Sequence, residues 1–173
     1  MINILTNLTA IAAAATPVFI TNGIQVIDTA SAECEPSQPM QIFMQGNPAA
    51  QLYNLVLANP ANGLMEFQIQ SNNCAGFSLS YPGETTGAGP LRAQAVIQLD
   101  SQVFFTISPA VPGETGSPFN IIYQSTLEPL YLTGWSPNLT FSNTGPLTFE
   151  RENAGDLRQQ WQFVWLKLLG IAN

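Results

Sequence analysis

The chain has 173 residues with 4 basic and 11 acidic side chains, a formal net charge of −7 and no histidine. The lack of histidine excludes Ser-His-Asp and Cys-His catalysis and any histidine-based metal site. Four basic residues provide no positive surface for nucleic acid or for an anionic membrane. Charged residues make up 9% of the chain, against roughly 25% in an ordinary soluble domain, and apolar residues make up 46%. We therefore expect one folded, non-catalytic domain that needs neither metal nor cofactor.

The first 17 residues are small and mostly apolar, and the first charged residue of the chain is Asp28. They lack the positive start of a secretory signal, so we expect an N-terminal extension that is not cleaved. No stretch reaches the roughly 18 unbroken apolar residues of a transmembrane helix, so no membrane insertion is expected. The expected location is the cytoplasm, or release without a cleaved signal peptide, with an extracellular location left open.

Cys34 and Cys74 are the only cysteines. They could form one disulfide, but two cysteines do not define a disulfide framework, and we favour two free thiols. The triplets that begin at Asn7 and Asn138 have the N-glycosylation pattern, which carries little weight without a secretory signal.

Glycine and proline, 13 of each, separate short runs in which apolar and polar residues alternate. This alternation is typical of half-buried strands, and the frequent turns favour many short ones. A pattern of strands recurs three times along the chain. The first strands are expected at 18–20, 67–69 and 119–121, the second at 25–28, 76–80 and 129–133, and the third at 40–43, 95–97 and 147–149.

A fourth strand in each repeat starts with glutamine, any residue and an aromatic residue. The three triplets end at Tyr53, Phe104 and Trp161. Four short strands cannot bury their inner face alone, whereas three such units can close a barrel around a threefold axis. We therefore expect the closing aromatics to lie near this axis, and the glutamines before them to be buried and to bond loop backbone groups.

These repeats resemble the ricin B-type β-trefoil family, whose units end in a Q-x-W triplet. The third unit is the nearest match because residues 159–163 read QQWQF, whereas the first two units have tyrosine and phenylalanine in place of tryptophan. The chain is similar in this respect to the lectins and protease inhibitors of mushrooms. The resemblance implies an all-β trefoil with a pseudo-threefold axis at 18–166, in units 18–63, 64–116 and 117–166, with apolar extensions at 1–17 and 167–173.

The resemblance also implies a place for a sugar. In sugar-binding trefoils an aspartate at the end of the second strand and an amide bond the sugar hydroxyls, while an aromatic ring stacks on the sugar. The first unit offers Asp28, Phe43, Asn47 and Gln51 for these roles, with Asn47 shifted by one position. Alternatively, Asp28 caps the next turn and Phe43 belongs to the core.

The other two units do not offer this set. In the second unit the aspartate position falls near 78–80 and the aromatic position near Gln94. In the third unit they fall at 132–133 and at Arg151. At most one sugar site is therefore expected, in the first unit.

Three functions fit the sequence. The resemblance favours a non-catalytic, lectin-like protein that binds glycans or glycoproteins. Low charge and apolar ends favour homo-oligomerisation through the extensions, or a self-assembling structural or storage protein. A protease inhibitor could insert one of the glycine- and proline-rich segments 82–91 and 110–118 into an enzyme. The sequence identifies neither the sugar nor the oligomeric state.

Overall fold

The computed structural model describes residues 16–29, 33–43, 48–57, 66–83, 93–111, 118–125, 127–136 and 143–165. Within them lie strands and two short 3-10 helices, with no α-helix. None of the described helices is long and apolar enough to cross a membrane. The elements are β1 (Val18–Thr21), β2 (Val26–Asp28), β3 (Gln38–Pro39), β4 (Gln41–Phe43), η1 (Pro48–Gln51), β5 (Leu52–Leu57), β6 (Glu66–Ser71), β7 (Phe77–Ser80), β8 (Ala93–Gln94), β9 (Val96–Leu99), β10 (Phe105–Pro109), β11 (Phe119–Gln124), β12 (Pro129–Gly134), β13 (Thr144–Glu150), η2 (Leu157–Gln159) and β14 (Gln162–Trp165).

These strands form three successive groups, which we call unit one (β1–β5), unit two (β6–β10) and unit three (β11–β14). Each predicted first, second and third strand overlaps a strand of its unit. The third strand of units one and two is split into two pieces around a single residue, Met40 in unit one and Ala95 in unit two. In unit three it is continuous, as β13. The predicted plan of four strands in each unit is confirmed.

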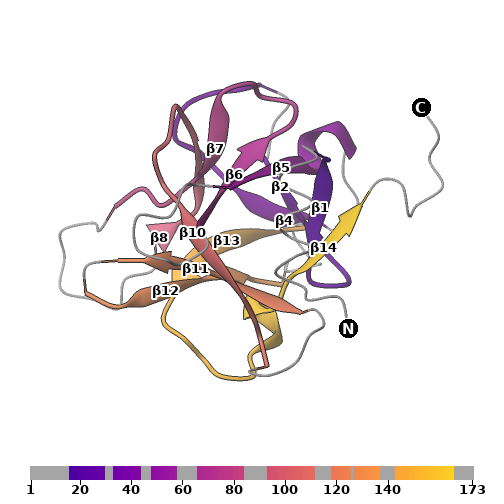
Figure 1. Cartoon of the computed structure of the whole chain (residues 1–173). Helices are drawn as coiled ribbons and strands as arrows, with labels where there is room; N and C mark the ends of the chain where they lie inside the picture. The colour runs from indigo at the N-terminus through magenta and orange to yellow at the C-terminus, as the bar shows by residue number, and fades with distance from the viewer. Residues whose placement is uncertain are drawn as a thin grey trace.

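Six strands close a barrel. β1 pairs with β5 and with β14, β5 with β6, β6 with β10, and β10 with β11. An isolated bridge between Phe119 of β11 and Trp161, just before β14, completes the ring. Figure 1 shows β1 and β14 side by side. The first and last strands therefore pair, as the fold predicts, and the ring has no free edge.

The three remaining hairpins, β2–β4, β7–β9 and β12–β13, meet around one axis. Met40, Ala95 and Leu147, the axis residues, are completely buried there and bond to one another in a cycle. The amide of Met40 donates to the carbonyl of Ala95 at 2.8 Å, Ala95 to Leu147 at 2.8 Å and Leu147 to Met40 at 3.4 Å. This cycle gives the molecule its pseudo-threefold axis and confirms the predicted β-trefoil.

The closing aromatics are buried, with one correction in unit two. Tyr53 and Trp161 have no exposed surface, as predicted, but the corresponding residue of unit two is Phe105 and not Phe104. Phe105 pairs with the first strand of its unit, as Tyr53 and Trp161 do. A shift of one residue moves a side chain to the other face of a strand, so Phe104 is only half-buried. Gln102 is exposed for the same reason, against the prediction of a buried glutamine.

Cys34 and Cys74 form a disulfide, with their Cα atoms 5.5 Å apart. The prediction of two free thiols is therefore wrong. The two residues are 40 positions apart, and only the packing of unit one against unit two brings them together. Chain spacing alone could not show this proximity.

Several predictions fall outside the described residues. They include nearly all of the N-terminal extension, the whole C-terminal tail and most of the two loops considered for protease inhibition. The residues concerned are 1–15, 30–32, 44–47, 58–65, 84–92, 112–117, 126, 137–142 and 166–173, which contain Asn7, Asn47 and Asn138.

Candidate functional site

Each unit carries a buried polar residue at or next to the end of its second strand. Asp28, Ser80 and Thr133 occupy this position, and each pairs with the residue that follows the axis residue of its unit. The shared register makes the three positions equivalent. They lie where the sequence analysis placed the aspartate position in each unit.

A hydrogen bond ties each of these residues to the segment that precedes the closing aromatic. Both partners are buried in all three units. The bonds run from Gln51 Nε2 to Asp28 Oδ2 at 3.0 Å, from Ser101 Oγ to Ser80 Oγ at 3.2 Å and from Gln159 Nε2 to Thr133 Oγ1 at 3.1 Å. This hydrogen bond is therefore a feature of the trefoil scaffold, although the residue types that form it differ between units.

Unit one alone places a carboxylate at this position. Asp28 is only 6% exposed, and burial of a carboxylate costs more free energy than burial of a hydroxyl. Because hydroxyls make the same tie in units two and three, the scaffold does not require an acid here. The negative charge of Asp28 also acts on Tyr53 in the barrel core. The pKa of the Tyr53 hydroxyl is raised mainly by burial and then by the charge of Asp28. A costly group that the fold does not require is typical of a functional position.

The aromatic position of the predicted site is also special to unit one. Phe43 ends β4 and is half-buried. The same register places Gln98 and Glu150 at the equivalent positions of the other units. The prediction of Gln94 and Arg151 was wrong because loops of different length precede the closing aromatics, so counting back from them loses the strand register.

The structure thus brings two of the four predicted site residues into contact. Asp28 and Gln51 are bonded, and Phe43 lies on the strand that pairs with the strand of Asp28. Asn47 lies outside the described residues. In the described part of the chain, no group of three or more histidine, cysteine, aspartate or glutamate side chains could hold a metal.

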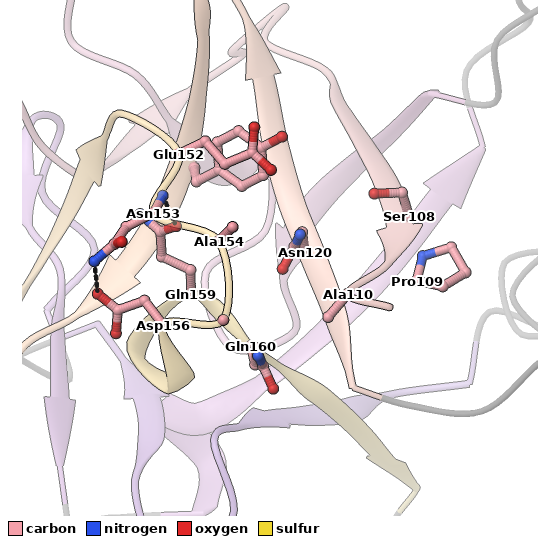
Figure 2. A pocket seen from close by; sticks show the side chains of 12 residues that line it. Ser108, Pro109, Ala110, Asn120, Glu152, Asn153, Ala154, Asp156, Gln159 and Gln160 are labelled. Atoms are coloured by element: carbon pink, nitrogen blue, oxygen red, sulfur yellow. Dashed lines mark hydrogen bonds between the residues drawn. The ribbon is translucent and has the colours of Figure 1, made fainter. Parts of the chain in front are cut away.

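Unit three contains a cavity that the sequence analysis missed. It has a volume of about 300 Å³ and lies between the loop 152–156 and the end of β10, over β11 (Figure 2). Its polar side chains include Asn120, Glu152, Asn153 and Gln160. No sequence pattern marks it, because Asn120 and the loop are far apart in the chain and meet only through the closed barrel.

Solved structures resemble the chain over 87% of its length. The designed threefold-symmetric protein ThreeFoil superimposes with a TM-score of 0.62 at 14% identity, over 99% of its own chain. The agglutinin of Rhizoctonia solani has a TM-score of 0.62 at 17% identity, over 95% of its chain. A ricin B-like lectin of Macrolepiota procera, solved in complex with lactose, has a TM-score of 0.57 at 17% identity, over 96% of its chain.

The chain has the β-trefoil fold. No protein-family model and no curated protein sequence matches it. Because trefoils serve unrelated functions, the ligand of this trefoil has to be argued from its own residues.

Proposed function

We propose that this trefoil is a non-catalytic, lectin-like protein that binds glycans or glycoproteins through unit one. The site consists of Asp28, Phe43, Asn47 and Gln51. The observation that carries the proposal is the buried carboxylate of Asp28, held by Gln51 where the other units use hydroxyls. The similarity of the fold to an agglutinin and to a lectin solved with lactose supports it.

The chemistry of these residues suits reversible recognition of a sugar. Carboxylate oxygens accept hydrogen bonds from sugar hydroxyls, and such charge-assisted bonds are the stronger ones. The amide of Gln51 fixes the orientation of the carboxylate before a ligand arrives, which lowers the entropy cost of binding. The ring of Phe43 stacks on the apolar face of the sugar.

The disulfide bears on where this function is exercised. Cys34 and Cys74 are bonded, and disulfides persist mainly in oxidising surroundings. We therefore propose that, of the locations that the sequence left open, the protein acts in the extracellular one, where glycans of cell surfaces are accessible. Self-assembly and protease inhibition depend on segments that lie outside the described residues, and no described contact favours either.

The test compares equivalent positions of two units. Wild type, Asp28→Thr and Thr133→Ser are screened on a glycan array, and the glycans that bind are titrated by calorimetry. Asp28→Thr gives unit one the residue of unit three, so it keeps an oxygen acceptor for Gln51 and loses the carboxylate with its charge. Losing a charge-assisted hydrogen bond costs about 1.5–3 kcal/mol, or about tenfold to more than a hundredfold in Kd.

We expect Asp28→Thr to bind that much more weakly and to unfold at the same or a higher urea concentration than wild type. Thr133→Ser, the matched control, keeps the wild-type affinity. The proposal is wrong if no glycan binds the wild-type protein, or if Asp28→Thr binds as tightly as wild type.

A further inference from the structure

We propose that the cavity of unit three is a second binding site, for a small uncharged ligand with several hydroxyl groups, such as a neutral hexose. It lies between the loop 152–156 and the β10–β11 hairpin (Figure 2). Its volume of about 300 Å³ is at the lower end of the range for ligand cavities. The proposal rests on this cavity and not on Asp28, so the two sites are independent.

The cavity is not the unit-three copy of the site in unit one. By strand register, Asp28 and Phe43 correspond to Thr133 and Glu150, and neither of these borders the cavity. Gln159, the counterpart of Gln51, is the residue that the cavity shares with the unit-three copy of that site. In unit three, Trp135 lies close to the position of Thr133, because it bonds to Thr148, the residue that pairs with Thr133. Its indole nitrogen donates to Thr148 at 2.7 Å, and the guanidinium carbon of Arg158 lies 4.3 Å from its ring centroid. The cavity lies beside β11, which contributes Asn120 to its lining.

The lining suits hydroxyl groups. A sugar hydroxyl both donates and accepts, and amide side chains offer both kinds of partner. Asn120, Asn153 and Gln160 supply amides, Ser108 a hydroxyl and Glu152 a carboxylate. No lysine or arginine is among the lining residues. The lining therefore favours a neutral ligand and disfavours an anionic sugar, which would meet Glu152 without a basic partner.

The loop that forms one wall is held in place by its own hydrogen bonds. Gln159 accepts from the amide of Asn153 at 2.9 Å and donates to the carbonyl of Arg151 at 2.8 Å. The side chain of Asp156 caps η2 by accepting from the amide of Arg158 at 2.9 Å. The side-chain amide of Asn153 donates to Asp156 at 3.1 Å, as Figure 2 shows. A ligand therefore meets a formed wall and pays little entropy for ordering it.

The floor is equally well fixed. Phe119 and Trp161 exchange two backbone hydrogen bonds, of 2.7 and 2.8 Å, and both side chains are buried. Neighbouring residues along extended backbone face opposite ways. Asn120, which follows Phe119, and Gln160, which precedes Trp161, are therefore turned toward the cavity, where both line it.

Tyr131 and Glu152 both line the cavity. Burial, and then the charge of Glu152, raise the pKa of the Tyr131 hydroxyl. The phenol therefore remains protonated and can donate to a ligand hydroxyl, while the Glu152 carboxylate can accept from one.

The test follows backbone amide signals by NMR during titration with D-galactose, D-glucose, D-mannose and N-acetyl-D-glucosamine, with N-acetylneuraminic acid as the anionic probe. With at least one neutral sugar, we expect saturable shifts at Asn120, Asn153 and Gly155, and none there with the anionic sugar. Asn120→Ala weakens this response about tenfold or more, as loss of a hydrogen-bonding side chain predicts. Gln98→Ala, which removes an amide from unit two, serves as the matched control and leaves it unchanged.

Asp28→Thr separates this site from the site in unit one. The shifts in unit three persist in this variant whether or not unit one binds sugar. If no neutral sugar moves these signals, or if Asn120→Ala responds like wild type, the cavity is not a binding site for neutral sugars, and the proposal for unit one is unaffected. If Asp28→Thr abolishes the unit-three shifts, the independence of the two sites is refuted.

Discussion

The contact of Gly134 with the ring of Trp161 allows a quantitative test of how the core is packed. A Cβ atom at Gly134 would lie 2.8 Å from Trp161 Cη2 and 3.3 Å from two carbons of Ile42. The indole cannot move aside easily, because it is completely buried and its nitrogen donates to the carbonyl of Leu132 at 2.9 Å. Overpacking costs about 1–3 kcal/mol, and the reduced chain entropy of alanine returns about 0.4–1 kcal/mol. Gly134→Ala should therefore lower the free energy of unfolding by about 1–2 kcal/mol.

The same geometry predicts the outcome of a double-mutant cycle. Trp161→Phe removes Cη2 and the indole donor, and it destabilises the protein by leaving a cavity and an unbonded carbonyl at Leu132. In that background the methyl group of Gly134→Ala enters the vacated space, so its cost should fall close to zero. The coupling energy is then about 1–2 kcal/mol, in the range measured for residues in contact.

Urea unfolding followed by circular dichroism measures all four proteins of this cycle. Tyr53→Phe, at the closing aromatic of unit one, is the control background, in which Gly134→Ala should keep its full cost. If the costs of Gly134→Ala and Trp161→Phe simply add, the indole ring is not what excludes a side chain at Gly134, and the reasoning fails.

Two further predictions concern the disulfide and one carboxyl group. The double variant Cys34→Ala/Cys74→Ala should lose about 4 kcal/mol of unfolding free energy, because the bond closes a loop with a sequence separation of 40; urea unfolding as stable as wild type would contradict this. A side-chain hydrogen bond from Arg158 is the main cause that lowers the pKa of Asp156 from 3.8 to about 2. Ionised Asp156 therefore stabilises the fold above about pH 4, and this contribution is lost as the pH falls toward 2. When thermal melting is measured from pH 7 to pH 2, the melting temperature of Asp156→Asn should decrease less between pH 4 and pH 2 than that of wild type. If the two melting temperatures decrease equally, the bond between Arg158 and Asp156 does not stabilise the fold.

The sequence predicts the scaffold well because its signals are local. Alternating apolar residues start the third strands at Met40, Ala95 and Leu147, and these are the residues that meet on the axis. A local pattern cannot decide between Phe104 and Phe105, because two phenylalanines follow one another. Only the pairing with β6 places the second of them, Phe105, in the core. The Cys34 disulfide was missed for the same reason, since it depends on contact between units.

The site could be predicted only in part. The resemblance to trefoils implies an aspartate at the end of the second strand, and Asp28 ends β2. The cavity in unit three depends on the approach of Asn120 to the loop 152–156, across the barrel closure. No pattern along one segment encodes such a meeting, because it is a property of two segments and of the register between them.

The cycle of backbone bonds at the centre means that no unit can satisfy its own polar groups. Each amide there finds its acceptor in the following unit, and the last returns to the first. A fragment of one or two units would leave a buried donor and a buried acceptor without partners, which is costly. The three units are therefore expected to fold as one cooperative whole, because the central amides and carbonyls are all paired only when the three units are present together.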